Sequence, residues 1–274
     1  MSDGRNLPGR TLATRIVTAL VLGAAATAGV LLLSTAALAV LLGAFVLAGS
    51  WEWARFAAFG SRARAVYVIA LAALMVAAFS RAALLVDAML VVALAGWLLA
   101  AYGLAVWPRP LSAAAVAVLG IAALLPAWLL LTHVHGAGPR GPWLAFTGLA
   151  LVAAADIGAF FVGRASGRRK LAPRISPGKT WEGVAGGIAL AAAAALLASY
   201  ALVLPLAVFL ATAVATAAAS VVGDLTVSML KRNVGAKDSG SLLPGHGGVM
   251  DRIDGLTTAI PVYALGLQLG GLVG

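Results

Sequence analysis

The sequence predicts an all-α, polytopic integral membrane protein with about nine transmembrane helices, forming a single membrane domain over residues 1–274. Of the 274 residues, 62% are hydrophobic and only 10% are charged, whereas soluble domains are roughly 45–50% apolar. Uncharged runs of about 20 residues, each long enough to cross a hydrocarbon core ~30 Å thick, recur along the chain. The chain has no cysteine, which excludes disulfides, thiolate catalysis and cysteine-based metal sites.

The expected helices follow from where charges, prolines and glycines interrupt the apolar runs. The run 16–50 has no charged residue and is too long for one span, so we divide it into two helices that turn near Ser34 and Thr35. Seven further helices are expected at approximately 65–80, 88–106, 112–133, 143–163, 183–202, 205–223 and 255–273. Five tryptophans lie at segment ends, as an aromatic belt predicts: Trp51, Trp53, Trp107, Trp143 and Trp181.

The N-terminal segment shares some features with a secretory signal peptide. Arg5, Arg10 and Arg15 precede the apolar run, and the Ala-Leu-Ala sequence at 37–39 resembles a cleavage site. The uncharged run is, however, far longer than the ~7–15 apolar residues of a signal peptide. We therefore expect a retained pair of membrane helices.

The distribution of basic residues predicts an orientation. With nine spans and the N-terminus inside, 17 of the 19 lysines and arginines fall on the inner side, and only Arg81 and Arg140 fall outside. The inner segments are 1–15, 51–64, 107–111, 164–182 and 224–254. We attribute the net charge of +10 to topology and to membrane lipids, and expect no nucleic acid partner. The protein is expected in a bacterial cytoplasmic membrane, with its two largest polar loops facing the cytoplasm.

The polar end of the helix 205–223 is the first candidate for chemistry. Asp224 closes this run, and Ser228 and Lys231 follow four and seven residues later, so all three share one helical face with Arg232 beside them. A carboxylate that only pairs with a lysine at the membrane surface is the alternative. Acidic residues at membrane depth are rare and mark functional sites, so we expect these side chains to serve a charged substrate.

A second group of charges stands before the last helix. Asp251 and Asp254 flank Arg252. One aspartate could simply cap the helix, but capping does not explain a pair. Asp224 and Asp251, on neighbouring helices, can converge on one Mg²⁺, which takes one or two carboxylates together with phosphate oxygens. Asp254 is the third candidate metal ligand.

The glycine-rich loop between these two groups suits a phosphate. His246 lies between glycines, and Gly247 and its neighbours let the backbone approach an anion closely. The imidazole could donate a hydrogen bond to an oxyanion. A loop histidine without a role is the alternative.

The other inner loop, 164–182, holds a second candidate anion site. Ser176, Lys179 and Thr180 surround a Pro-Gly pair, which predicts a turn before a helix whose free N–H groups suit a phosphate. The segment lacks the G-x-x-x-x-G-K-[ST] pattern of a Walker-type ATPase. Asp156, about two turns inside the preceding helix, is costly to bury unpaired, so we expect it to face a polar cavity shared with the loops.

These patterns together resemble the phosphatidate cytidylyltransferase family, the CDP-diacylglycerol synthases. Residues 228–254 follow the family's long C-terminal motif at every charged position, and residues 176–183 follow its S-P-x-K-T-W-E-G element. The region of Asp156 is also similar. Residues 1–155 match the family less specifically, only in hydrophobic character and at Glu52-Trp53. The catalytic helices and loops are therefore expected within 156–274.

The resemblance implies transfer of a cytidylyl group from CTP to phosphatidate in the membrane, with Mg²⁺ as cofactor and pyrophosphate as the second product. The negative charge of the phosphates would be neutralised by the metal, held by Asp224 and Asp251, together with four cations: Lys231, Arg232, Lys237 and Arg252. A phosphate nucleophile is already ionised near pH 7, so His246 and Asp238 would orient groups rather than abstract protons. The substrates would also contact Asp156, Ser176, Lys179, Thr180, Ser228 and Gly247. The resemblance leaves open a second, monovalent cation. We also expect a homodimer, although no motif in the sequence indicates one.

Three other functions fit the sequence less well. A CTP-dependent polyprenol or phytol kinase would share a membrane nucleotide site, but it needs a base for a neutral alcohol and does not explain the long C-terminal motif. A cation-coupled transporter would place aspartates within helices, yet it needs no pair of loops dense in phosphate-binding groups. CDP-alcohol phosphotransferases are excluded because their D-G-x2-A-R-x8-G-x3-D-x3-D motif is missing.

Overall fold

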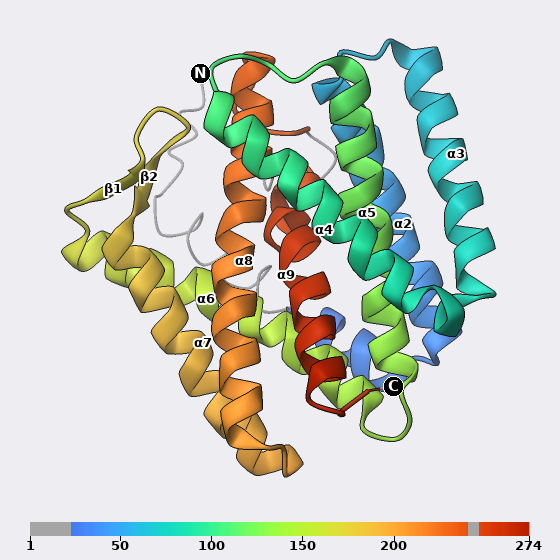
Figure 1. The fold of residues 1–274 in the computed structure, drawn as a ribbon, viewed down its shortest axis with the longest axis vertical. Helices are drawn as coiled ribbons and strands as arrows, with labels where there is room; N and C mark the ends of the chain where they lie inside the picture. Colours follow the sequence, from blue (N-terminus) through green and yellow to red (C-terminus); the bar gives the residue numbers. More distant parts are fainter. Residues whose placement is uncertain (1–22, 241–246, 274) are drawn as a thin grey trace, which may run out of the picture.

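The computed structural model describes residues 23–240 and 247–273, and these form an almost entirely helical bundle (Figure 1). After a helical stretch at Gly23–Leu32, the helices are α2 (Thr35–Phe56), α3 (Ser61–Phe79), α4 (Ala82–Val106), α5 (Ala113–Gly136), α6 (Gly141–Ser166), α7 (Trp181–Leu202), α8 (Leu206–Asn233) and α9 (Met250–Leu269). Among the described residues, seven helices, α2 to α8, are long and apolar enough to cross a membrane. The expected all-α polytopic architecture is confirmed.

The predicted turn near Ser34 and Thr35 is also confirmed. Ser34 is the N-cap of α2, and its side chain accepts a hydrogen bond from the backbone N–H of Ala37, as serine commonly does at this position. Four boundaries differ from expectation by five residues or more. Helix α2 ends at Phe56 rather than near 50, and α4 begins at Ala82 rather than near 88. Helix α8 continues ten residues beyond position 223, and α9 begins at Met250 rather than near 255. Charged residues therefore mark the edge of the apolar span but do not end the helix.

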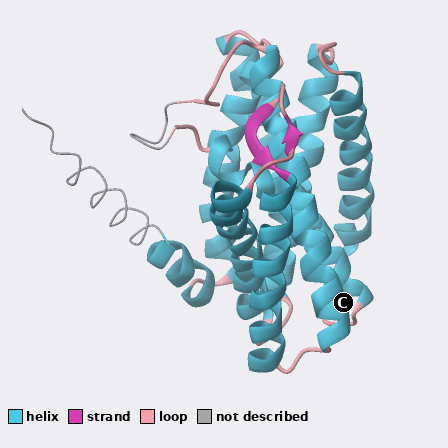
Figure 2. Cartoon of the chain, turned by 90° about the vertical axis from the view of Figure 1, so that its left-hand side faces the viewer, coloured by secondary structure: helices cyan, strands magenta, loops and turns pink. Residues whose placement is uncertain are grey.

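A short hairpin interrupts the helical pattern between α6 and α7. Strand β1 (Lys170–Ala172) pairs antiparallel with β2 (Ser176–Thr180), and Figure 2 shows this hairpin in magenta near one end of the bundle. The predicted turn at the Pro-Gly pair is wrong, because both residues lie within β2 and the chain reverses between the two strands. Thr180 is the N-cap of α7, where its hydroxyl accepts from the N–H of Gly183 at 3.1 Å.

The loops predicted to share the inner side meet at one end of the bundle. Three contacts between them are the Arg174 guanidinium over the Trp107 ring (5.0 Å), Arg232 Nε donating to the Ile175 carbonyl (3.2 Å) and Arg55 Nη1 donating to the Ser239 carbonyl (3.0 Å). At the opposite end, Thr35 Oγ1 and His135 Nδ1 lie 2.9 Å apart, and Gln268 Nε2 donates to Asp87 at 2.9 Å. The grouping inferred from charge thus matches the fold for the four inner segments that have described residues, whereas segment 1–15 lies outside them.

Small residues let the helices that carry the site approach closely. A Cβ on Gly223 of α8 would overlap the backbone carbonyl of Asp254 in α9, and one on Gly187 of α7 would overlap the carbonyl of Ala155 in α6. Lipid tails are as apolar as the side chains between helices, so close van der Waals packing supplies much of the association. These two contacts hold α8 close to α9 and α6 close to α7.

Trp53 does not belong to an aromatic belt, contrary to expectation. Its side chain is only 1% exposed, and its indole Nε1–H donates to the Val116 carbonyl at 2.8 Å. The bond ties α2 to α5 within the core. Trp51, Trp143 and Trp181 are exposed, as the belt requires.

Candidate functional site

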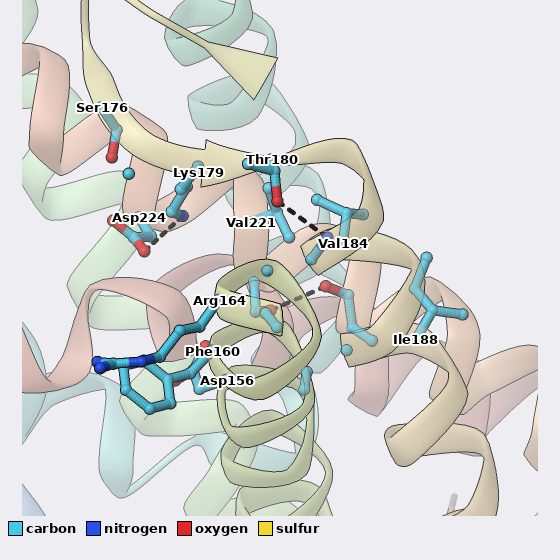
Figure 3. A pocket seen from close by; sticks show the side chains of 18 residues that line it. Asp156, Phe160, Arg164, Ser176, Lys179, Thr180, Val184, Ile188, Val221 and Asp224 are labelled. Carbon is cyan, nitrogen blue, oxygen red and sulfur yellow. Dashed lines mark hydrogen bonds and ion pairs between the residues drawn. The ribbon is translucent and has the colours of Figure 1, made fainter. Parts of the chain in front are cut away.

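A cavity of about 530 Å³ lies between α6, α7 and α8, beneath strand β2. Figure 3 shows Lys179 and Asp224 facing each other at its polar end, where they form an ion pair. Ser176, Thr180 and Asp156 line the same cavity. Its remaining wall is apolar and includes Ala155, Ala159, Val184 and Ile188 from α6 and α7. The cavity therefore joins a charged end to a hydrophobic wall.

Three carboxylates interact electrostatically with Lys179. Asp224 pairs with its ammonium group directly and also accepts a hydrogen bond from Ser228 Oγ at 3.2 Å. Asp156 lies within electrostatic range of Asp224 and Lys179. Asp254 lies within electrostatic range of Asp224, Lys179 and Lys231. The shared polar cavity expected for Asp156 is present, and Lys179, with Lys231 near Asp254, offsets part of the negative charge.

Lys231 and Asp251 form a second ion pair, at 2.8 Å. Both side chains are largely buried, with 13% and 14% exposed. The other oxygen of Asp251 accepts from the backbone N–H of Ser239 at 2.9 Å and of Gly248 at 3.1 Å. Asp251 therefore fixes Lys231 and also holds together the two described ends of the glycine-rich segment.

The expected metal ligands are divided between these two pairs. Asp224 is engaged by Lys179, Asp251 by Lys231 and two backbone amides, and Asp254 lies near both lysines. Among the described residues, no group of three or more His, Asp or Glu side chains is close enough to hold a metal ion by itself. The chemistry of the donors still suits a hard cation, since carboxylate oxygens are what Mg²⁺ prefers and it commonly takes only one or two of them.

The other expected site residues lie outside the two ion pairs. Arg232 donates to the carbonyls of Ile175 and Ala236, so it ties the hairpin to the end of α8. Lys237, Asp238 and Arg252 have exposed side chains. Gly247 has a positive φ of 81°, which glycine adopts at little cost. His246 lies outside the described residues.

Two residues near the cavity were not expected from the sequence. Arg164, at the end of α6, lines the cavity wall. Glu182, in the first turn of α7, accepts from the backbone N–H groups of Arg168 and Arg169 at 3.1 Å and so holds the loop that leads into β1. A carboxylate two residues after the capping Thr180 was the available signal, because acidic side chains favour helix N-termini.

Comparisons with known proteins identify relatives of this chain. The chain matches the model of the cytidylyltransferase family over residues 13–269. It is 46% identical to the phosphatidate cytidylyltransferase of Pseudomonas aeruginosa over 95% of this chain and 98% of that protein. It is also similar to the proteins of the same name from Haemophilus influenzae (48% identity over 42% of each chain) and Bacillus subtilis (43% identity over 39% of this chain and 40% of that protein).

Proposed function

This chain belongs to the cytidylyltransferase family, and we propose that its two lysine–carboxylate pairs form the site at which it transfers a cytidylyl group from CTP to phosphatidate. The products are CDP-diacylglycerol and pyrophosphate, and the chain is a multi-pass membrane protein of phospholipid synthesis. The observation that carries the assignment is the 46% identity to the P. aeruginosa phosphatidate cytidylyltransferase over nearly the full length of both chains. The placement of the residues of both motifs around one cavity and the adjoining ion pair supports the location.

The reaction needs charge neutralisation more than covalent help. An oxygen of the phosphatidate phosphate attacks the α-phosphorus of CTP, a new P–O–P bond forms, and the bond to the β-phosphate breaks to release pyrophosphate. The attacking phosphate monoester is largely ionised near pH 7, because its second pKa is about 6. No strong general base is therefore required. Lys179 and Lys231 supply positive charge, and fixed charges stabilise a transition state without reorganising during the reaction.

Magnesium fits the carboxylates of this site. Asp224 and Asp254 would hold it, with phosphate oxygens of the substrates completing its coordination, and it would supply further positive charge to the phosphates. Asp251 could be a metal ligand only if its ion pair with Lys231 were broken. Because its contacts organise Lys231 and the segment around it, we assign it to that role first. A second, monovalent cation stays a prediction.

The apolar wall of the cavity favours phosphatidate as the ligand between α6 and α7. Its headgroup phosphate would meet Ser176, Lys179 and Arg164, and CTP would approach from the loops of α8 and α9. The excess of basic residues at that end of the bundle favours the cytoplasmic side of a bacterial inner membrane. A homodimer belongs to the same proposal, and cross-linking in native membranes would test it.

A direct assay tests the function. Purified protein is supplied with phosphatidate, Mg²⁺ and each of the four nucleoside triphosphates, labelled at the α-phosphate. Label should enter lipid from CTP far faster than from the other three, with release of one pyrophosphate per lipid. A parallel assay with γ-labelled nucleotides detects a lipid kinase, which would put label into lipid from the γ-phosphate and none from the α-phosphate. No incorporation from either position would contradict the proposal.

A further inference from the structure

Glu52, in the last two turns of α2, is a buried carboxylate in contact with the segment that leads into α9. Its side chain is only 1% exposed. One of its oxygens accepts from Ser239 Oγ and from the N–H of Met250, both at 2.8 Å, and the other accepts from the N–H of Val249 at 3.2 Å. These donors lie 187 to 198 residues further along the chain. A buried carboxylate is costly unless hydrogen bonds compensate it, and this one is compensated by that single segment.

The contact provides a helix cap from a distant part of the chain. The first N–H groups of a helix have no partner within it, and Val249, the N-cap of α9, has no side chain that could cap them. Glu52 accepts from two of these groups. An anion at this position also interacts favourably with the helix dipole. The start of α9 is therefore defined by a residue of α2.

The same contact continues to the proposed site. Ser239 donates its hydroxyl to Glu52 and its backbone N–H to Asp251. Asp251 directly follows Met250, whose N–H donates to Glu52, and it forms the ion pair with Lys231. An unbroken series of hydrogen bonds thus runs from α2 through the start of α9 to the ammonium group of Lys231.

The glycines around Glu52 show how closely the carboxylate is enclosed. A Cβ on Gly240 would overlap its carboxylate oxygen, and a Cβ on Gly248 would overlap both that carboxylate and the Ser239 hydroxyl. Neither glycine has a positive φ. Lack of space beside the carboxylate, rather than backbone conformation, therefore requires glycine at both positions.

We propose that Glu52 is a positioning residue for cytidylyl transfer, which sets the start of α9 and thereby the Lys231–Asp251 pair. This inference rests on the proposed function for its kinetic consequence. It extends the site to the N-terminal half of the chain, and it assigns Glu52 no contact with substrate or metal.

The test is Glu52→Gln, which keeps the length of the side chain but replaces one of its two accepting oxygens with an NH₂ group, so that at least one of the three donors faces another donor. Asp87→Asn is the matched control, because it makes the same change in α4 at the opposite end of the bundle, where Asp87 accepts from Gln268. We expect Glu52→Gln to lower kcat by about 10- to 100-fold, the range for groups that orient reactive side chains. The KM for phosphatidate should change less than threefold, and the control should match the parent.

A distance measurement separates positioning from a loss of folding or of the reaction itself. Nitroxide labels on Ala63→Cys and Asp238→Cys, both exposed positions of a chain without cysteine, report where the segment before α9 lies relative to the start of α3. We expect a narrow distribution in the parent and a broadened or shifted one with Glu52→Gln. This readout holds even if the parent makes no CDP-diacylglycerol, an outcome that would refute the proposed function alone.

Ser239→Ala keeps the inference testable if Glu52→Gln does not fold. It removes one of the three donors and should lower kcat in the same direction by a smaller factor, with a thermal midpoint near that of the parent. An unchanged kcat and an unchanged distance distribution, in whichever of the two variants folds, would overturn the proposal.

Discussion

At the scale of single residues, the structure distinguishes lysines that serve the site from cations that anchor the protein. Lys231 is largely buried and bonded to Asp251, whereas Arg169 is exposed and contributes to the loop through its backbone N–H, which Glu182 accepts. Lys231→Ala should lower kcat/KM by about 10²-fold or more, the scale of losing a transition-state charge contact. Arg169→Ala should change it by less than about threefold. Steady-state kinetics of the two purified variants makes the comparison, and equal losses would contradict it.

Asp224 offers a second prediction at this scale. Asp224→Asn removes a proposed Mg²⁺ ligand and the partner of Lys179, so turnover should fall by at least about 10²-fold at saturating substrates. Raising Mg²⁺ should recover part of this loss, because an amide oxygen still binds the cation weakly. The thermal midpoint of the variant serves as the control for folding. Near-parental activity at low Mg²⁺ would contradict a metal role.

The residues of both motifs could be identified from sequence, but their pairing could not. Asp224 and Lys231 share a helical face, yet each pairs with a residue from another element, and such tertiary choices leave no periodic signal. Glu52 was harder to identify, because two of its three donors are backbone N–H groups and any residue can supply those.

At the scale of helices and strands, close packing of α8 against α9 sets the positions of Asp224 and Asp254. Gly223→Ala would place a methyl group against the carbonyl of Asp254, and overpacking of this kind typically costs about 1–3 kcal/mol. We expect a lower thermal midpoint together with a loss of activity. Gly138→Ala is not a suitable control because its φ of 79° introduces backbone strain; Gly60→Ala, with open space around its Cβ, is the appropriate one. Full activity of Gly223→Ala would show that the spacing of α8 and α9 is not critical.

Most helices were predictable because a membrane requires long uncharged runs. The hairpin β1–β2 was not predictable. A Pro-Gly pair favours a turn, but the chain reverses before it, between the two strands, where Arg232 donates a hydrogen bond to the Ile175 carbonyl. The extra turns of α8 were missed for a related reason. Backbone hydrogen bonding continues past the membrane surface, where hydropathy gives no further information.

At the scale of the whole molecule, the fold predicts opposite accessibility for its two ends. Arg168 and Arg140 are both exposed and lie at the two ends of α6. Arg168→Cys should react with a membrane-impermeant maleimide only after the membrane is opened, and Arg140→Cys should react in intact spheroplasts. Both readouts use a chain without native cysteine. Labelling of both positions, or the reverse pattern, would contradict the proposed orientation.

The cavity that joins a charged end to an apolar wall has a consequence for how the enzyme is supplied. A ligand held against α6 and α7 arrives and leaves by diffusion in two dimensions, within the bilayer, while a nucleotide arrives from bulk solution in three. The concentration that governs the lipid step is then a mole fraction in the surrounding amphiphile rather than a molarity. Diluting phosphatidate with neutral lipid or detergent at constant total amount would slow the reaction, although nothing in the aqueous phase had changed.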